Sequence, residues 1–267
     1  MLVPLFFSLS FTQAESAGRA GIIFLAFCLA ASFIYIVNDI ADREHDRRHP
    51  KKFRRPIASG AIGVPAARIA AGTCLLACLA LLAGLGDGRA AGAVIAYLVL
   101  NLGYSWRLKH VPLIDVFCIA LGFVLRVYAG AYAIGVAVSN YLFLVTLFLS
   151  LFLAFCKRWS ELKKHGASGT RKVLNGYSLV TLDRYIAILA GGVVVSYALY
   201  TQDAVTLARF GGRLVYSVVF VLYGLFRYMS ELDRTSDYDD PTENLYKDKA
   251  LIATCGVYVL YVAIVAL

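Results

Sequence analysis

The sequence GIIFLAFCLAASFIYIV, residues 21–37, runs directly into NDIADREHDRRHPKKFRRPIASG, residues 38–60. The first part holds no charged residue, whereas the second is the densest charged stretch of the chain. Its acidic residues lie between positions 39 and 46, and most of its basic residues follow, up to position 55. We expect an active site here, because both signs of charge gather where an apolar segment ends.

The composition is that of a membrane protein. Hydrophobic residues make up 60% of the chain and charged residues 16%, whereas soluble domains hold about 45–50% and about 25%. Helices suit the apolar runs because a helix satisfies its own backbone hydrogen bonds in lipid. We predict an all-α, polytopic bundle of about nine transmembrane helices, forming one domain over residues 1–267. The runs are 1–13, 18–37, 64–86, 90–105, 112–135, 140–156, 184–201, 212–229 and 250–267.

Basic residues follow every second apolar run. The loops after the second, fourth, sixth and eighth runs hold most of the Lys and Arg outside the runs. Cytoplasmic loops are enriched in these residues, so we expect all four loops, and the stretch 38–60, on the cytoplasmic side. The net charge of +9 then reflects this bias and attraction to the lipid bilayer, and we expect no nucleic-acid partner.

The acidic half of the charged stretch suits a metal ion. Asn38, Asp42 and Asp46 are spaced four apart, which places them on one face of a helix, and Asp39 lies beside that face. Carboxylates with an amide oxygen suit Mg²⁺, which often bridges substrate phosphates. The alternative is a solvated helix end whose acidic residues pair with basic neighbours.

The basic half suits phosphate. Lys52, Arg54 and Arg55 closely follow the carboxylates, and both residue types bind phosphate groups. Contact with lipid headgroups alone is the alternative for such a loop. Farther along, the stretch Tyr104 to Lys109 combines aromatic and basic residues, which is also typical of ordinary interface anchors.

Two charged residues interrupt the fifth apolar run. Asp115 and Arg126 are 11 residues apart, so they share a helix face without direct contact. Charges inside a span normally face the bundle interior or a wet cavity and mark function, although a structural pair between them is the alternative. After the sixth run, Lys157 and Glu161 share a helix face, so a simple ion pair is one interpretation there.

These residues resemble a known family. Asn38-Asp39-x-x-Asp42-x-x-x-Asp46 is similar to the first aspartate motif of the UbiA-type intramembrane prenyltransferase superfamily, and the continuation to Gly60 resembles its decaprenyl-phosphate phosphoribosyltransferase branch. The resemblance implies a helical bundle whose central cavity is capped by cytoplasmic loops. Further similar segments are Tyr104-Ser105-x-x-Leu108-Lys109, Asp115 with Gly122-Phe123-x-x-Arg126-x-x-Ala129-Gly130, Lys157-Arg158-x-x-Glu161-Leu162, and Asp240-Pro241-x-Glu243 with Asp248-Lys249.

The branch implies a particular reaction. Its donor would be 5-phosphoribosyl 1-diphosphate and its acceptor a polyprenyl phosphate, with diphosphate released, in a bacterial inner membrane for cell-envelope polysaccharide synthesis. The superfamily's second aspartate motif is replaced here by Lys157-Arg158-Trp159-Ser160-Glu161, which fits a donor other than a prenyl diphosphate. The resemblance also leads us to expect a basic, tryptophan-containing segment before the first span, and it leaves a homo-oligomer open.

The resemblance assigns roles to three sets of residues. The metal set is Asn38, Asp39, Asp42 and Asp46. The catalytic set is Asp39, Asp42, Asp46 and Glu161. The substrate-binding set is Lys52, Arg54, Arg55, Tyr104, Lys109, Asp115, Arg126, Lys157 and Arg158.

Two other functions are weighed against this one. An aromatic prenyltransferase of a quinone or haem pathway would share the fold and the metal site, but we would expect it to keep the second aspartate motif. A transporter would line a pathway with its membrane charges. Charges gathered at one face, with the opposite face nearly uncharged, argue against alternating access.

The Asp42→Ala variant should remain extractable as a folded membrane protein but lose turnover, because it lacks one of the expected Mg²⁺ ligands. Turnover of the phosphoribosyl donor by the purified protein measures this. Retained magnesium-dependent activity would remove the first motif from the mechanism.

Overall fold

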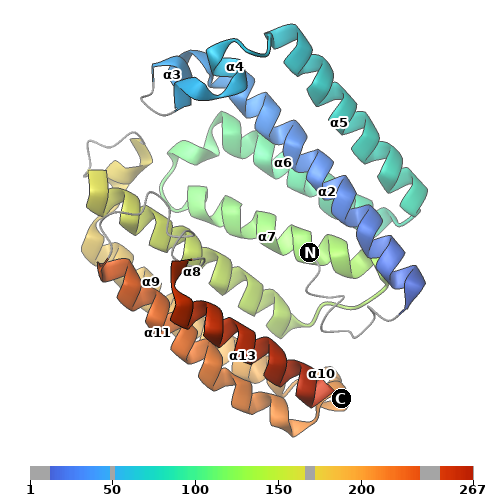
Figure 1. Cartoon of the computed structure of the whole chain (residues 1–267), viewed down its shortest axis with the longest axis vertical. Helices are drawn as coiled ribbons and strands as arrows, with labels where there is room; N and C mark the ends of the chain where they lie inside the picture. Colours follow the sequence, from blue (N-terminus) through green and yellow to red (C-terminus); the bar gives the residue numbers. More distant parts are fainter. Residues whose placement is uncertain (1–12, 49–51, 166–171, 235–246, 267) are drawn as a thin grey trace. The chain divides into compact units, whose positions relative to one another are not determined.

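Helix α2, Ala14–Ala41, carries the second apolar run and ends where the charged stretch begins. The computed structural model describes residues 13–48, 52–165, 172–234 and 247–266, and every regular element in these ranges is a helix (Figure 1), which confirms the all-α prediction. The other elements are α3 (Arg43–Arg47), η2 (Lys52–Arg54), α4 (Pro56–Ser59), α5 (Val64–Leu85), α6 (Gly88–Trp106), η3 (Leu108–His110), α7 (Ile114–Ala133), α8 (Asn140–His165), η4 (Lys172–Gly176), α9 (Leu179–Thr201), α10 (Ala204–Phe210), η5 (Gly212–Ser217), α11 (Val218–Arg234) and α13 (Lys249–Ala266).

Seven segments among the described residues are long and apolar enough to cross a membrane. They correspond to α2, α5, α7, α8, α9, η5 with most of α11, and α13. The predicted run 90–105 does form a helix, α6, but it is not one of the seven, and the run 1–13 lies outside the described residues. A multi-pass membrane protein is therefore confirmed, whereas the count of nine spans stays a prediction.

The chain divides into two compact units. Unit 1 comprises residues 1–108 and 122–138, and unit 2 comprises residues 109–121 and 139–267. Helix α7 begins in unit 2 and ends in unit 1. The prediction of a single domain over the whole chain stays a prediction.

The core of unit 1 lies among α2, α5 and α6. α2 packs along α5 (Figure 1), and its buried residues, including Ile23 and Phe27, lie in one cluster with Cys78 of α5 and Tyr97 of α6. The rings of Phe27 and Tyr97 lie 4.7 Å apart between centroids. This packing fixes the position of Tyr97 along the axis of α2.

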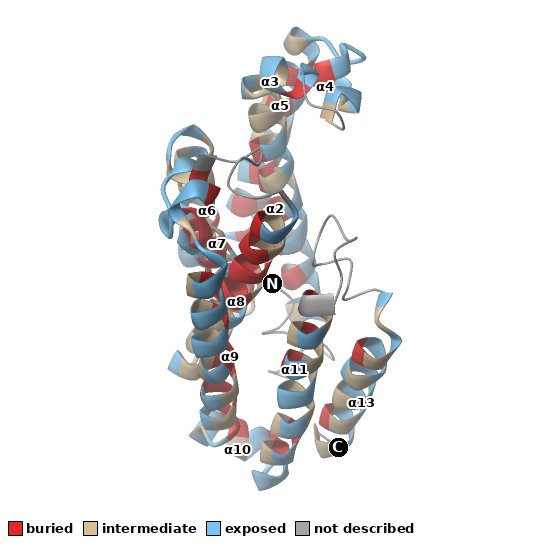
Figure 2. Ribbon diagram, turned by 90° about the vertical axis from the view of Figure 1, so that its left-hand side faces the viewer, coloured by how far each residue is buried: buried red, intermediate tan, exposed pale blue. Residues whose placement is uncertain are grey.

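Exposed residues lie along the length of the long helices (Figure 2), and many of them are large and apolar. Ile69 of α5 is 72% exposed and Leu260 of α13 is 61% exposed. Exposed apolar surface on this scale marks an interaction surface in a soluble protein, and it is the surface that a spanning helix presents to lipid.

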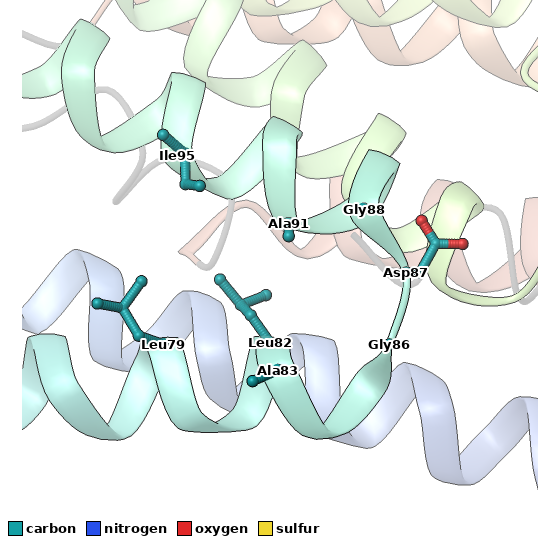
Figure 3. A pocket seen from close by; sticks show the side chains of 8 residues that line it. All are labelled: Leu79, Leu82, Ala83, Gly86, Asp87, Gly88, Ala91 and Ile95. Carbon is teal, nitrogen blue, oxygen red and sulfur yellow. The ribbon is translucent and has the colours of Figure 1, made fainter.

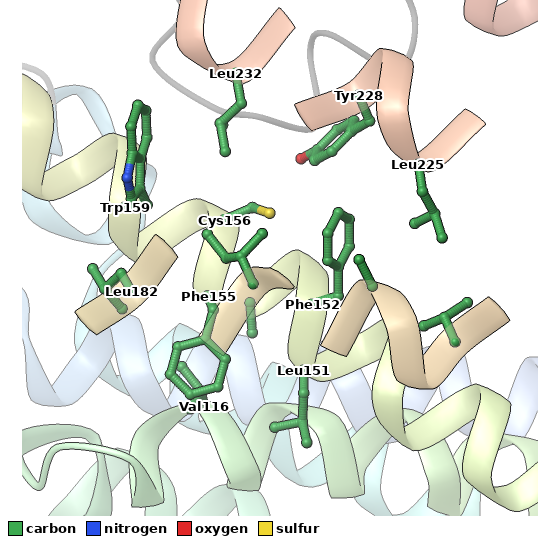
Figure 4. Packing of buried hydrophobic residues seen from close by; sticks show 14 of the residues in the cluster. Val116, Leu151, Phe152, Phe155, Cys156, Trp159, Leu182, Leu225, Tyr228 and Leu232 are labelled. Carbon is green, nitrogen blue, oxygen red and sulfur yellow. The ribbon is translucent and has the colours of Figure 1, made fainter. Parts of the chain in front are cut away.

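The core of unit 2 forms around α8. Phe152 and Phe155 of α8 lie in one buried cluster with Leu182 of α9 and Tyr228 of α11 (Figure 4). α9 approaches α8 closely at Gly192, where a Cβ atom would lie 3.0 Å from the ring of Phe148. Small residues allow such close approach between membrane helices. The same side of α8 continues to its C-terminal turns, which carry Arg158 and Glu161.

An ion pair connects the last span, α13, to α11. Arg227 Nε of α11 donates to Asp248 Oδ2 at 2.6 Å, and Asp248 Oδ1 accepts the backbone N–H groups of Ala250 and Leu251 at the start of α13. The Arg227 hydrogen bond holds the pKa of the Asp248 carboxyl below its usual value. Because the folded-state pKa is lowered, this pair stabilises the fold above the unfolded pKa of Asp, about 3.9, and the contribution is lost as pH falls through the lower folded pKa.

The Asp248→Asn variant should lower the melting temperature in detergent by a few degrees at pH 7, since a half-buried ion pair contributes modestly. The difference in melting temperature between this variant and the wild type should disappear as the solution is acidified below pH about 4. Asp87→Asn is the matched control, because Asp87 caps α6 through the N–H groups of Arg89 and Ala90. An equal loss at pH 7 in both variants would assign the effect to capping and contradict the ion-pair account.

Candidate functional site

In unit 1, one guanidinium group joins two carboxylates of the charged stretch. Arg55 Nη1 lies 2.8 Å from Asp39 Oδ1 and 2.8 Å from Asp46 Oδ2. Asp46 is 1% exposed, and Asp39 is half-buried in the last turn of α2. Charge-assisted hydrogen bonds of this length are the strong ones in proteins. The acidic and basic halves of the stretch therefore meet.

The local fold explains how they meet. α2 ends at Ala41, yet the backbone N–H of Asp42 still donates to Asn38 O, and the N–H of Asp46 donates to Asp42 O, both at 2.8 Å. This helical pattern continues into α3 and keeps Asn38, Asp42 and Asp46 in the register predicted from their spacing. The chain then returns through η2 to Arg55, which directly precedes α4.

Helix α4 holds Arg55 in place. Pro56 occupies the first turn of α4, where its missing N–H costs nothing. Gly60 ends the helix with a φ of 85°, a left-handed conformation that favours glycine. Arg47 Nε of α3 donates to the backbone oxygen of Ala58 at 3.0 Å, which ties α3 to α4.

One oxygen of this cluster fits a hard cation. Asp46 Oδ1 is buried and accepts no hydrogen bond from the described residues, and Lys52 Nζ lies 3.9 Å away. A buried carboxylate oxygen of this kind suits Mg²⁺. In the part of the chain that the structure describes, however, no three His, Cys, Asp or Glu side chains are grouped as a metal site, and Arg55 holds Asp39 and Asp46. The metal set of Asn38, Asp39, Asp42 and Asp46 stays a prediction.

In unit 2, a second charged cluster is almost fully buried. Arg158 Nε lies 2.7 Å from Asp115 Oδ2, and Arg158 Nη1 lies 2.9 Å from Glu161 Oε2. Asp115 is 0% exposed and Arg158 is 1% exposed. Removing one partner of such a pair leaves a charge without compensation in a dry environment. Asp115 therefore fixes the position of Arg158 and Arg158 neutralises Asp115.

Tyr177 completes this cluster and was missed by sequence reasoning. Its hydroxyl donates to Asp115 Oδ1 at 2.8 Å and accepts the backbone N–H of Leu113 at 2.6 Å. Leu113 has a φ of 67°, in the left-handed region that non-glycine residues rarely adopt. Burial raises the pKa of Tyr177 above its usual range, so the hydroxyl stays a neutral donor. Tyr177 lies 62 residues from Asp115, and no local pattern links them.

Arg126 has a partner that the sequence did not indicate. Its Nη2 donates to the Tyr97 hydroxyl at 2.9 Å, and its Cζ lies 4.9 Å from the ring centroids of both Tyr97 and Phe123. Asp115 pairs with Arg158 instead, so the structural pair considered between Asp115 and Arg126 is not the arrangement found.

The other predicted residues are more open. Arg54 is exposed and lies over the ring of Phe53. Tyr104 lies in the last turn of α6 and Lys109 in η3, both half-buried, and Lys157 is half-buried in α8 beside Arg158. The predicted segment 240–243 lies outside the described residues.

An apolar groove of about 340 Å³ opens between α5 and α6 in unit 1 (Figure 3). Leu79 and Leu82 line it from α5, and Ala91 and Ile95 line it from α6. None of the predicted site residues lines it, so we assign no chemistry to this groove.

Comparison with known proteins defines the family. Residues 1–242 match the UbiA prenyltransferase family. A decaprenyl-phosphate phosphoribosyltransferase from Corynebacterium glutamicum is 38% identical over 91% of this chain and 75% of its own length. The protein of that name from Mycolicibacterium smegmatis is 32% identical over 91% of this chain and 79% of its own length.

A solved structure agrees in fold. It is a UbiA homolog from Archaeoglobus fulgidus bound to DMAPP and Mg²⁺, with a TM-score of 0.72 and 22% identity over 98% of this chain and 92% of that chain. The chain therefore belongs to the UbiA prenyltransferase family and, within it, to the branch of its phosphoribosyltransferase relatives. It is a membrane-embedded transferase.

The Tyr177→Phe variant should lower the free energy of unfolding by about 1–3 kcal/mol, because it leaves one buried oxygen of Asp115 and one N–H without a partner. Denaturation in detergent measures this. Tyr185→Phe is the matched control, since both rings pack against Phe155 but only the Tyr177 hydroxyl bonds to Asp115. An equal effect in both variants would show that the hydroxyl contributes nothing.

Proposed function

We propose that this chain transfers phosphoribose from 5-phosphoribosyl 1-diphosphate to a polyprenyl phosphate of the decaprenyl type. The observation that carries this proposal is the buried Arg158, which is paired with Asp115 and belongs to the stretch Lys157 to Glu161 that replaces the second aspartate motif of the resembled superfamily. A fixed arginine there favours an additional phosphate group on the donor, which a prenyl diphosphate lacks.

The relatives support the same acceptor. Two proteins named decaprenyl-phosphate phosphoribosyltransferase match 91% of this chain each, at 38% and 32% identity. Identity at this level over nearly the full chain makes their reaction the first hypothesis for this one. The solved UbiA homolog carries DMAPP, but at 22% identity it informs the fold only.

The chain's own residues account for most of the mechanism. Arg55 and Lys52, with Arg54 beside them, would bind the donor diphosphate next to Asp39 and Asp46. Asp115 and Glu161 would hold Arg158 for a further phosphate group. Tyr104, Lys109 and Lys157 are proposed as additional phosphate contacts. Positioning and charge stabilisation then supply the rate enhancement.

The reaction is a direct displacement at ribose C1. An oxygen of the acceptor phosphate forms the new bond to C1, and the bond from C1 to the diphosphate oxygen breaks, with its electron pair leaving on diphosphate. The acceptor phosphate is already an anion, so no general base is needed. Mg²⁺ held by Asn38, Asp39, Asp42 and Asp46 would offset the charge of the leaving diphosphate.

The proposed setting is a bacterial inner membrane with the active site on the cytoplasmic side. The basic loops support this orientation, and a water-soluble sugar phosphate donor would reach the site from that side. The product, polyprenyl-phosphoryl phosphoribose, would serve as a precursor of cell-envelope polysaccharide.

The test is an assay of the purified chain in liposomes with decaprenyl phosphate, Mg²⁺ and radiolabelled phosphoribosyl diphosphate. We expect labelled lipid to form and chelation of the metal to stop its formation. Asp46→Asn should reduce turnover by about a hundredfold or more, as for loss of a group that stabilises developing charge. Glu44→Gln is the matched control, because Glu44 is 70% exposed on the same helix and should retain turnover.

Two outcomes would contradict the proposal. One is no labelled lipid from the wild type, while labelled prenyl diphosphate is consumed with an aromatic acceptor. The other is full activity of Asp46→Asn, which would remove the unit 1 cluster from the reaction.

A further inference from the structure

Residues 111–113, which we name the α7 entry loop, join η3 to α7 in unit 2. The loop runs directly into the helix, because the N–H of Asp115 donates to Val111 O at 3.1 Å. Its last residue, Leu113, has the left-handed φ of 67°. Lys109 belongs to η3, just before the loop. The conformation of the loop therefore decides where Lys109 lies relative to Asp115.

Two contacts from the chain around η4 hold this loop. The Tyr177 hydroxyl accepts the N–H of Leu113 at 2.6 Å and donates to Asp115 Oδ1 at 2.8 Å. Directly before it, Gly176 lies so close to Pro112 that a Cβ atom on the glycine would overlap the proline ring. A non-glycine residue keeps a left-handed conformation only where its surroundings impose it. The tyrosine hydroxyl and the close-packed glycine supply that constraint.

The core of unit 2 fixes these contacts. Leu174 of η4 is 2% exposed and belongs to the buried cluster around α8. The N–H of Tyr177 donates to Leu174 O at 3.1 Å. The Tyr177 ring packs edge-on against Phe155 of α8, with 6.3 Å between the centroids. Because η4 and the Tyr177 ring are held by the core, the α7 entry loop takes its position from them.

The same hydroxyl connects the loop to the buried charges. Asp115 accepts from Tyr177 at Oδ1 and from Arg158 at Oδ2. Arg158 is 1% exposed, whereas Lys109 is half-buried. Lys109 is therefore the more accessible of these two cations, both of which are proposed to bind donor phosphates. Binding is stronger when such a group is already held in its bound position.

We infer that Tyr177 is a positioning residue for the phosphoribosyl donor. Its hydroxyl fixes the α7 entry loop beside Asp115 and thereby holds Lys109 where that lysine binds a donor phosphate. Gly176 contributes by allowing the close approach of Pro112. Tyr177 acts through Lys109 and needs no contact with the donor. This inference rests on the proposed function, which names 5-phosphoribosyl 1-diphosphate as donor and Lys109 as one of its contacts.

The experiment is equilibrium binding of radiolabelled phosphoribosyl diphosphate, with Mg²⁺, to the full chain in nanodiscs below the melting temperature. Lys109→Gln should weaken binding about tenfold, as for loss of a hydrogen bond to a charged group. Tyr177→Phe and Gly176→Ala should each weaken it about threefold or more, because they displace the loop. Adding Tyr177→Phe to Lys109→Gln should change binding by less than about twofold, since residues that act as one unit are not additive.

Hydrogen exchange of the segment 109–115 reports on the loop without any substrate. Exchange should be faster in Tyr177→Phe and Gly176→Ala, because the loop loses a contact that holds it. Tyr185→Phe and Gly192→Ala are the matched controls. Tyr185 also packs against Phe155, and Gly192 is also closely approached, by the ring of Phe148. Both controls should keep wild-type exchange in this segment and donor binding within about twofold.

Additive losses in the double variant overturn the inference, because Tyr177 would then act independently of Lys109. Unchanged donor binding in Tyr177→Phe, together with faster exchange of the loop, overturns it as well and leaves the tyrosine a purely structural role. If Tyr177→Phe does not fold, Gly176→Ala, alone and combined with Lys109→Gln, decides by the same readouts. A wild type that binds no phosphoribosyl diphosphate contradicts the proposed function itself.

Discussion

The guanidinium of Arg55 between the carboxylates of Asp39 and Asp46 is the constraint on which unit 1 depends. α2 is an apolar helix of 28 residues that ends in polar side chains, and unpaired charges at that boundary are costly. The short helices α3 and α4 return the chain so that basic residues neutralise the acidic ones. In the function that we propose, the anionic oxygens of this cluster would hold a metal and its cations would bind the phosphates of a diphosphate donor.

Unit 2 has a similar arrangement, in which an arginine again lies between two carboxylates. Arg158 follows the core residues of α8 along the helix and is neutralised by Asp115 and Glu161. Tyr177 donates a hydrogen bond to the other carboxylate oxygen of Asp115, Oδ1. Because Nε and Nη1 are both held by carboxylates, the guanidinium keeps little freedom to move, and its position is well defined. This fixed cation distinguishes the chain from the superfamily pattern of paired carboxylates.

Sequence predicted the features that are local. Seven of the predicted apolar runs form helices that are long and apolar enough to cross a membrane among the described residues. The spacing of four between Asn38, Asp42 and Asp46 predicted their common register. Partners from distant segments were not predictable, because the approach of two helices leaves no periodic signal. Asp115 was weighed as a partner of Arg126 on the same helix, but residues of other segments pair with each. The metal set could be proposed from residue types but not confirmed from their placement.

Equilibrium binding without acceptor shows whether the site binds a phosphoribosyl rather than a prenyl diphosphate. We expect the purified chain to bind 5-phosphoribosyl 1-diphosphate only when Mg²⁺ is present. Inorganic diphosphate should compete for this site, and geranyl diphosphate should displace the donor poorly. Tight magnesium-dependent binding of geranyl diphosphate, together with no binding of the phosphoribosyl donor, would contradict the account.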